Sequence, residues 1–319
     1  MAMEVKPIDI GIDVCKKTLA VARADEKVIE ITNEAGSIQS WLKSLPGPAR
    51  IAVEATGIFH VELVEQAHQA GHTIYVIDGY RLNHYRDSIG GRAKTDASDA
   101  RLLLRYLDRE ADDLRPWSPP PKGYRDLQQL ILRRARLIQA RVKLDQSLSG
   151  LSQLGSSRRA LVRHLDQLDR LLIKRIRQVL QNRQWYREAR RIQAVEGIGE
   201  ITAAALIMTF QRGPFDNSDA FIAFVGMDVR TRQSGAYSGK EKLSKKGAAE
   251  LRRLLYMAAM TARRSPVWAG FYQRCLARGL KPTQALVALA RKLARVAFAL
   301  LKNGTEYRPR IPQEGCTAT

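Results

Sequence analysis

The chain has 319 residues, of which 53 are Lys or Arg and 32 are Asp or Glu, so its formal net charge is +21. So large a positive charge argues against an ordinary metabolic enzyme and is typical of proteins that neutralise nucleic-acid phosphates, although a ribosome-associated protein or a solubilising surface would also carry it. Hydrophobic residues make up 45% of the chain, which indicates folded domains rather than a disordered basic tail.

The first 110 residues are predicted to form an α/β domain. Residues 8–14, 18–22 and 28–32 have the short apolar runs of strands, and their tight spacing indicates a meander. Helices are predicted at 37–45 and 59–70, with strands at 51–54 and 73–77. This order predicts a mixed sheet of the ribonuclease-H-like kind, an assignment by analogy because many α/β domains share the later alternation.

Residues 111–123 are predicted to be a proline-rich linker, and residues 124–190 a helical coiled-coil hairpin. Prolines favour extended backbone in the linker. Apolar residues then recur at heptad and at three-and-four spacing, in two sets: Leu130, Leu137, Leu144, Leu151, and Leu161, Leu165, Leu168, Leu172, Ile176, Val179. These stripes would pack either within the chain or against another chain. The Arg-rich opposite faces would be solvated or follow a phosphate backbone.

Residues 191–304 are predicted to form a mostly helical, all-α C-terminal domain, followed by a loose tail at 305–319. Gly197 and Gly199 lie in a run that resembles the turn of a helix-hairpin-helix element, where glycines let the backbone approach a phosphate. Glu196 replaces the usual proline of that element. A helix-helix turn without a ligand is the alternative.

Four carboxylates lie at predicted element ends and form a candidate metal site. Asp13 ends the first strand and Glu54 the fourth, while Asp96 and Asp99 are three residues apart on one face of a helix start. Clustered carboxylates repel one another unless a hard cation such as Mg²⁺ or Mn²⁺ takes their oxygens as ligands. Singly, Asp96 would cap its helix and Glu54 would form a surface ion pair. Asp9, on the same strand face as Asp13, is a weaker candidate ligand.

Six short runs carry a family resemblance. They are Gly-Ile-Asp-Val at 11–14, Glu-Ala-Thr-Gly at 54–57, Lys-Thr-Asp-x-x-Asp-Ala at 94–100, Phe-Val-Gly-Met at 224–227, Arg-Thr-Arg-Gln-Ser-Gly at 230–235 and Leu-Ser-Lys-Lys-Gly at 243–247. In this order they resemble the Piv/MooV-type DEDD transposases, an insertion-sequence family that includes the bridge-RNA-guided recombinases. The resemblance extends from about residue 8 to residue 304.

The resemblance implies a RuvC-like N-terminal domain whose metal ligands are Asp13, Glu54, Asp96 and Asp99, and a C-terminal transposase domain whose nucleophile is Ser234. It also implies a composite site between subunits of a tetramer, and a structured bridge RNA that pairs with donor and target DNA. Strands would be cut and rejoined through a phosphoserine link without a high-energy cofactor.

The residues alone favour a turn serine in a Gly-rich loop for Ser234, and Ser238, Ser244 and Tyr237 lie nearby. No histidine flanks Ser234, so a metal would have to ease its deprotonation. A scissile phosphate could be held by the neighbouring cations Arg230, Arg232, Lys240, Lys242, Lys245 and Lys246.

Two alternative functions remain open at this point. One is a metal-dependent endonuclease that resolves DNA junctions without a covalent intermediate, and the other is a non-enzymatic binding module. The five histidines show no metal-ligand spacing, and three scattered cysteines indicate neither a disulfide framework nor a zinc site. Without a signal peptide or an uninterrupted apolar span, we expect a cytoplasmic bacterial protein that acts at the nucleoid and contacts no membrane.

Overall fold

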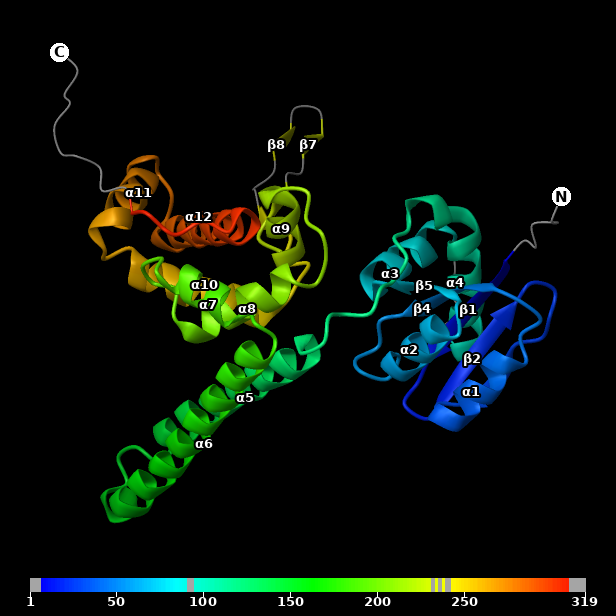
Figure 1. Ribbon diagram of the computed structural model, residues 1–319, viewed down its shortest axis with the longest axis horizontal. Coiled ribbons are helices and arrows are strands. Elements are labelled where there is room, and N and C mark those ends of the chain that lie inside the picture. The colour runs from blue at the N-terminus through cyan, green and yellow to red at the C-terminus, as the bar shows by residue number, and fades with distance from the viewer. Residues whose placement is uncertain (1–6, 91–94, 231–232, 235–236, 239–241, 310–319) are drawn as a thin grey trace. The chain divides into compact units, whose positions relative to one another are not determined.

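The computed structural model describes residues 7–90, 95–230, 233–234, 237–238 and 242–309, with only the backbone described at 233–234 and 237–238 (Figure 1). The chain divides into two compact units, Met1–Pro119 and Pro120–Thr319. The division falls within the proline-rich segment. The backbone N–H of Trp117 donates to the carbonyl of Ile74 at 2.6 Å, so the first part of this segment is bound to the N-terminal unit.

The N-terminal unit is built on a five-stranded mixed sheet, as predicted. Its strand order is β3-β2-β1-β4-β5. The first three strands are antiparallel neighbours, whereas β4 runs parallel to both β1 and β5. The strands are β1 (Ile8–Val14), β2 (Thr18–Arg23), β3 (Ile29–Thr32), β4 (Ala49–Glu54) and β5 (Thr73–Ile77).

Helices pack on both faces of this sheet. They are α1 (Ala35–Lys43), α2 (Val61–Gln69), α3 (Gly79–Ser88) and α4 (Asp96–Glu110), with a 3₁₀ turn at Ala111–Asp113. Ile10 and Ile12 of β1 are buried in one core with residues of α1 and α2, and the other face packs against α3 and α4. Helix α3 is absent from the predicted elements. Its sequence shows almost no apolar periodicity, and Leu82 is its one buried residue.

Helix α4 approaches the sheet unusually closely at Gly11 of β1. A Cβ atom at this position would lie within 3.0 Å of the Ala100 carbonyl oxygen, the Leu104 nitrogen and the Leu104 Cα. Ala20 and Ala22 of β2 are buried against Ala100 on the same face. Because the strand side chains here are small or absent, the helix backbone can lie directly on the sheet. This packing brings the first turn of α4 to the carboxyl end of β1.

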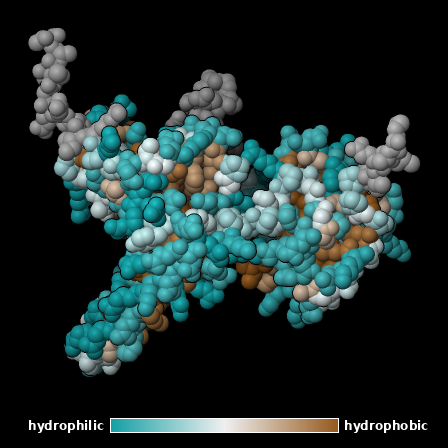
Figure 2. Space-filling model, viewed as in Figure 1, coloured by the Kyte–Doolittle hydropathy of each residue, from teal (hydrophilic) through white to brown (hydrophobic). Residues whose placement is uncertain are grey.

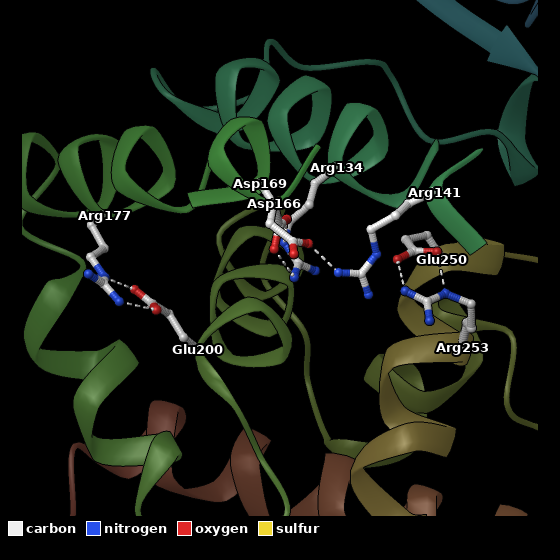
Figure 3. A network of polar contacts seen from close by, with 8 residues as sticks. All are labelled: Arg134, Arg141, Asp166, Asp169, Arg177, Glu200, Glu250 and Arg253. Atoms are coloured by element: carbon white, nitrogen blue, oxygen red, sulfur yellow. Dashed lines mark hydrogen bonds and ion pairs between the residues drawn. The ribbon is translucent and has the colours of Figure 1, made fainter. Parts of the chain in front are cut away.

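The C-terminal unit begins with a helical hairpin of α5 (Tyr124–Ser147) and α6 (Gly155–Asn182), which lie side by side (Figure 1). Three ion pairs join the two helices: Arg134 with Asp169, Arg141 with Asp166, and Asp145 with Arg158. The residue numbers of the partners increase along α5 and decrease along α6, so the two helices are antiparallel. Figure 3 shows the first two of these contacts. Arg134 and Arg141 belong to the Arg-rich faces for which the sequence analysis predicted solvent or a phosphate backbone, and in the structure they pair within the hairpin itself.

The root of the hairpin belongs to the core of the C-terminal unit. Leu127 and Ile131 of α5, with Ile176 and Leu180 of α6, are buried in one cluster with the helices that follow. Those are α7 (Tyr186–Gln193), α8 (Glu200–Phe210), α9 (Ser218–Val225), α10 (Ala249–Ala262), α11 (Pro266–Ala277) and α12 (Pro282–Asn303). The mostly helical prediction is confirmed. Among the described residues, no helix is both long and apolar enough to span a membrane.

Candidate active site

Two of the four predicted carboxylates end neighbouring parallel strands. The register between β1 and β4 pairs Gly11 with Ala52 and Ile12 with Val53, so the next positions along the strands are Asp13 and Glu54. Side chains alternate along a strand, and Ile12 is buried on the opposite face, so Asp13 lies on the face that α4 covers. The sheet therefore brings these two carboxylates together at one edge.

The other two carboxylates lie in the first turn of α4. Thr95 is the N-cap: its hydroxyl accepts from the backbone N–H of Ser98 at 3.1 Å, and the Ser98 hydroxyl accepts from the Thr95 N–H at 2.8 Å. Because this reciprocal capping box closes the helix end, the alternative in which Asp96 is the cap is wrong. Asp99 is buried, whereas Asp96 is exposed.

The electrostatics of Asp13 show that the other three carboxylates all act on it. Burial, followed by the negative charges of Asp99, Asp96 and Glu54, raises the pKa of Asp13 to about 6. The side chain is 9% exposed. Ligand atoms of Asp13, Asp96 and Cys15 lie within 4.8 Å of one another. The structure thus places Asp13 and Asp96 within ligand distance of each other, with Glu54 and Asp99 near enough for their charges to act on Asp13.

Cys15 is a neighbour of the site that the sequence analysis did not single out. Its thiol donates to Asp96 Oδ2 at 3.4 Å. Burial and this hydrogen bond raise the pKa of the Cys15 thiol to about 11. The group therefore remains a protonated donor at neutral pH, and the ligands suited to an ion are the carboxylate oxygens. Such a donor set is compatible with a hard divalent cation.

Helix α3 supplies two further features of the site. A Cβ atom at Gly79, in the first turn of this helix, would collide with Glu54 Oε1, so the glycine allows the carboxylate to lie against the helix start. Near the other end of α3, Arg86 Nη2 donates to Asp99 Oδ1 at 2.7 Å. The side chains of Arg86 and Asp99 are only 12% and 9% exposed. The sequence analysis missed Arg86 because it lies in none of the six family runs, and because α3 has too little apolar periodicity to be predicted as a helix.

Asp9, the weaker candidate, is held elsewhere. Both of its carboxylate oxygens accept from Arg50 of β4, each at 2.6 Å. Asp9 lies one residue from the start of β1, whereas Asp13 lies one residue from its end. The bidentate ion pair engages the Asp9 carboxylate at the opposite end of the strand from the cluster.

The backbone of Ser234 lies in a β-ladder between α9 and α10. The strands β6 (Val229–Arg230) and β9 (Lys242–Leu243) pair antiparallel, and so do β7 (Gln233–Ser234) and β8 (Tyr237–Ser238). Ser234 pairs with Tyr237. The side chains of both lie outside the described residues, as do that of Ser238 and the whole of Arg232 and Lys240. Short strands thus form part of the stretch around Ser234 that the sequence analysis described as a Gly-rich loop.

Close backbone packing and hydrogen bonds hold the base of this ladder. Gly226 ends α9 with φ +73°, and a Cβ there would lie 2.8 Å from backbone atoms of Lys246. The Ser244 hydroxyl donates to Asp228, which links the two strands at this base. The cations that the sequence singled out and the structure describes here all have exposed side chains: Arg230, Lys242, Lys245 and Lys246.

The predicted helix-hairpin-helix turn joins α7 to α8. Gly197 has φ +87°, and a Cβ there would collide with backbone atoms of α10, so packing within the chain accounts for this glycine. Gly199 is the N-cap of α8 and has open space around it. Glu196, which replaces the usual proline, accepts from Trp268 Nε1 at 3.0 Å and from the Tyr307 hydroxyl at 2.8 Å. Phosphate binding at this turn remains a prediction.

Comparison with known protein families matches both units of the chain. A transposase model of the IS110-type DEDD group matches residues 10–154, which include all four carboxylates, and the model described as Transposase IS116/IS110/IS902 family matches residues 189–273, which include Ser234. The chain is an IS110-type DEDD transposase. It is therefore a DNA recombinase, and the resemblance found in the sequence is confirmed.

Individual relatives of this IS110-type transposase agree with the assignment. It is 26% identical to the pilin gene-inverting protein of Moraxella lacunata, over 95% of this chain and 98% of the relative. It is 25% identical to a probable family 20 transposase of Pseudomonas aeruginosa, over 94% and 98%. An insertion element IS110 protein of Streptomyces coelicolor, described as uncharacterized, is 32% identical over 38% of this chain and 30% of the relative.

Proposed function

We propose that this transposase cuts and rejoins DNA strands through a covalent phosphoserine intermediate on Ser234, with Mg²⁺ held by Asp13, Glu54, Asp96 and Asp99. The observation that carries the metal site is the position of Asp13 close to the other three carboxylates: burial, followed by their negative charges, raises its pKa. A divalent cation relieves this repulsion, and Mn²⁺ has the same preference for oxygen ligands.

A RuvC-like fold for the N-terminal unit is part of this proposal. The strand order β3-β2-β1-β4-β5 supports it, since a three-stranded meander is extended on one side by two parallel strands. The carboxylates at the ends of β1 and β4, opposite the start of α4, also support it. The metal, when bound, would polarise the phosphoryl oxygens and lower the cost of deprotonating the attacking hydroxyl.

In the proposed reaction, Ser234 Oγ attacks a DNA phosphorus and a DNA oxygen leaves. One phosphodiester bond of the DNA is broken and one phosphodiester bond to serine is formed, so no external energy source is needed. A DNA hydroxyl from another strand then attacks the phosphoserine and releases the serine. Arg230, Lys242, Lys245 and Lys246 would stabilise the negative charge that develops on the phosphate. One relative is named for inverting a gene, and inversion requires that cut strands be rejoined.

We also propose that the enzyme acts on donor and target DNA with a structured bridge RNA that pairs with both. The family resemblance supports this guide, and the net charge of +21 suits a protein that holds more than one polyanion.

Ser234→Ala should eliminate every covalent protein–DNA adduct. The test incubates purified protein, cognate RNA, Mg²⁺ and labelled donor and target DNA, and then looks for adducts that survive denaturant. Ser244→Ala is the matched control, because Ser244 is a nearby serine outside the position that the resemblance assigns to the nucleophile, and this variant should retain the adduct. Cleaved DNA without an adduct, equally abundant in Ser234→Ala, would instead identify a junction-resolving nuclease.

The hairpin supports a further proposal, that it is a coiled-coil interface in a tetramer built from dimers. Within the distal part of the arm, beyond Ala135 of α5 and before Ile176 of α6, no described residue of either helix is buried. Seven large apolar side chains there are exposed: Val142, Leu144, Leu151, Leu154, Leu161, Leu168 and Leu171. Figure 2 shows brown apolar patches among the hydrophilic surface of this arm. Packing within one chain fully buries only the root of the predicted stripe; farther along the arm, Leu137, Leu165 and Leu172 are half-buried and the other stripe residues are exposed.

Replacing Leu168 and Leu171 together by Asp should reduce the oligomer to smaller species. These side chains are 50% and 57% exposed, so the fold of the monomer does not depend on them, whereas an apolar interface would lose its contacts and acquire two charges. Light scattering measures the molar mass. A double Asp substitution of the exposed Gln146 and Gln167 adds the same charge and should leave the mass unchanged. An unchanged mass for the leucine variant would refute the interface.

A further inference from the structure

Arg86 of α3 is the one basic side chain for which the structure describes an ion pair with a carboxylate of the cluster. It comes from a different element than any of the four carboxylates, and it reaches Asp99 on the buried side of α4. At 12% and 9% exposed, both partners are largely removed from water. A pair so buried is screened weakly, and Asp99 would be left with an unbalanced charge if Arg86 were removed.

The contact is made to a single oxygen of Asp99. Arg86 Nη2 lies 2.7 Å from Oδ1, and the Ser98 hydroxyl lies 3.3 Å from that same atom. Both hydrogen bonds end on Oδ1, so they restrict the rotation of the carboxylate. Oδ2 takes part in neither of them. Outer hydrogen-bond partners of this kind orient metal ligands and raise affinity for the ion.

We propose that Arg86 is a positioning residue of the metal site, which holds Asp99 through Oδ1 so that Oδ2 can bind a divalent cation. The inference rests on the proposed function, because it takes Asp99 to be a ligand. The positive charge of Arg86 also offsets part of the repulsion among the carboxylates in the metal-free protein. A guanidinium suits this position, since it stays charged when buried and donates in a fixed plane.

Direct binding of Mn²⁺ tests this role independently of DNA chemistry. Free Mn²⁺ is measured by electron paramagnetic resonance during titration of the full chain carrying Arg86→Gln, Arg86→Lys or no substitution. Arg86→Gln should weaken Mn²⁺ binding by about 10- to 100-fold, the usual effect of losing such a partner. Arg86→Lys should recover part of the affinity. Strand transfer by Arg86→Gln should return at high Mn²⁺, which a purely structural defect would not allow.

Arg109→Gln is the matched control. Arg109 lies near the far end of α4, its side chain is 70% exposed, and its loss removes the same charge. It should leave Mn²⁺ binding unchanged. Equal affinity in Arg86→Gln and the unsubstituted chain would overturn the inference. Tighter Mn²⁺ binding by Arg86→Gln would also overturn it, because it would show that Arg86 competes with the ion. If Arg86→Gln does not fold, undiminished affinity in Arg86→Lys overturns it.

The same titration separates this inference from the proposed function. Asp13→Asn should remove most Mn²⁺ binding if the carboxylates form the site. Binding that depends on Asp13 but not on Arg86 would overturn only the role of Arg86. No binding by the unsubstituted chain would overturn the metal site and the inference together.

Discussion

Replacing Asp13 by Asn should raise the melting temperature of the metal-free protein at pH 8 and abolish DNA strand transfer. The pKa of Asp13 is raised from 3.8 to about 6 in the folded chain. A raised pKa means that the folded state favours the protonated acid, so the stability that this group contributes is present below the unfolded pKa and is lost as the pH rises through about 6. At pH 8 the ionised carboxylate costs on the order of 2–3 kcal/mol, a cost that the neutral amide avoids.

Thermal unfolding in a chelator at pH 5 and pH 8 measures this difference. Because pH 5 already lies above the pKa of the unfolded carboxyl, Asp13→Asn should melt higher there too, and its advantage should be about twice as large in free energy at pH 8, where the melting temperatures should differ by several degrees. Mn²⁺ should then stabilise the unsubstituted protein alone. Asp9→Asn is the matched control on the same strand: it leaves Arg50 without its bidentate partner, so it should lower the melting temperature at pH 8. Equal stability of Asp13→Asn and the unsubstituted chain at pH 8 would contradict the argument that burial and the neighbouring charges penalise the ionised carboxylate.

Gly11→Ala should destabilise the N-terminal unit by about 3 kcal/mol or more, at the upper end of overpacking effects. The new methyl group would meet backbone atoms of Ala100 and Leu104, which cannot rotate away as a side chain can. Helix α4 would have to move off β1, and Asp96 and Asp99 would move with it away from Asp13. Strand transfer should therefore fall even in molecules that remain folded.

Hydrogen exchange of the β1 and β2 amides, followed by mass spectrometry, reports on this unit within the full chain. Protection should fall in Gly11→Ala. Gly36→Ala is the control, because nothing lies within 4 Å of a Cβ built at Gly36 in α1, and alanine is the better helix former. Protection in Gly11→Ala equal to that in Gly36→Ala would show that the helix does not need this close approach.

The sequence was sufficient to predict the strands, most helices and the four carboxylates of the N-terminal unit. Strands of alternating or continuous apolar residues, such as β1 and β4, carry their period in the local sequence. Asp13 and Glu54 could be placed because strand ends are local features, and the parallel register then makes them neighbours. The convergence of Asp96 with them was an expectation from the carboxylates at element ends, and the packing of α4 at Gly11 is the physical reason for it.

The hairpin shows the limit of periodicity as a predictor. Its leucine spacing predicted two long helices, and the structure contains them. Spacing alone did not distinguish Ile176, which is buried in the core, from Leu168, which is half exposed. Both occupy the same kind of position in the repeat. The difference arises from whether the helices that follow, α7 and α8, lie over that turn of α6.

The sequence by itself therefore determined the nucleic-acid class, the family, the mixed sheet and the identity of the acidic residues. Only the tertiary structure decided what surrounds them. It assigned Asp9 to Arg50, Asp99 to Arg86 and the thiol of Cys15 to Asp96. These partners could not be predicted because most of them come from separate elements with no shared period. A hydrogen bond between side chains depends on how those elements pack, a property that the spacing of residues along one element does not contain.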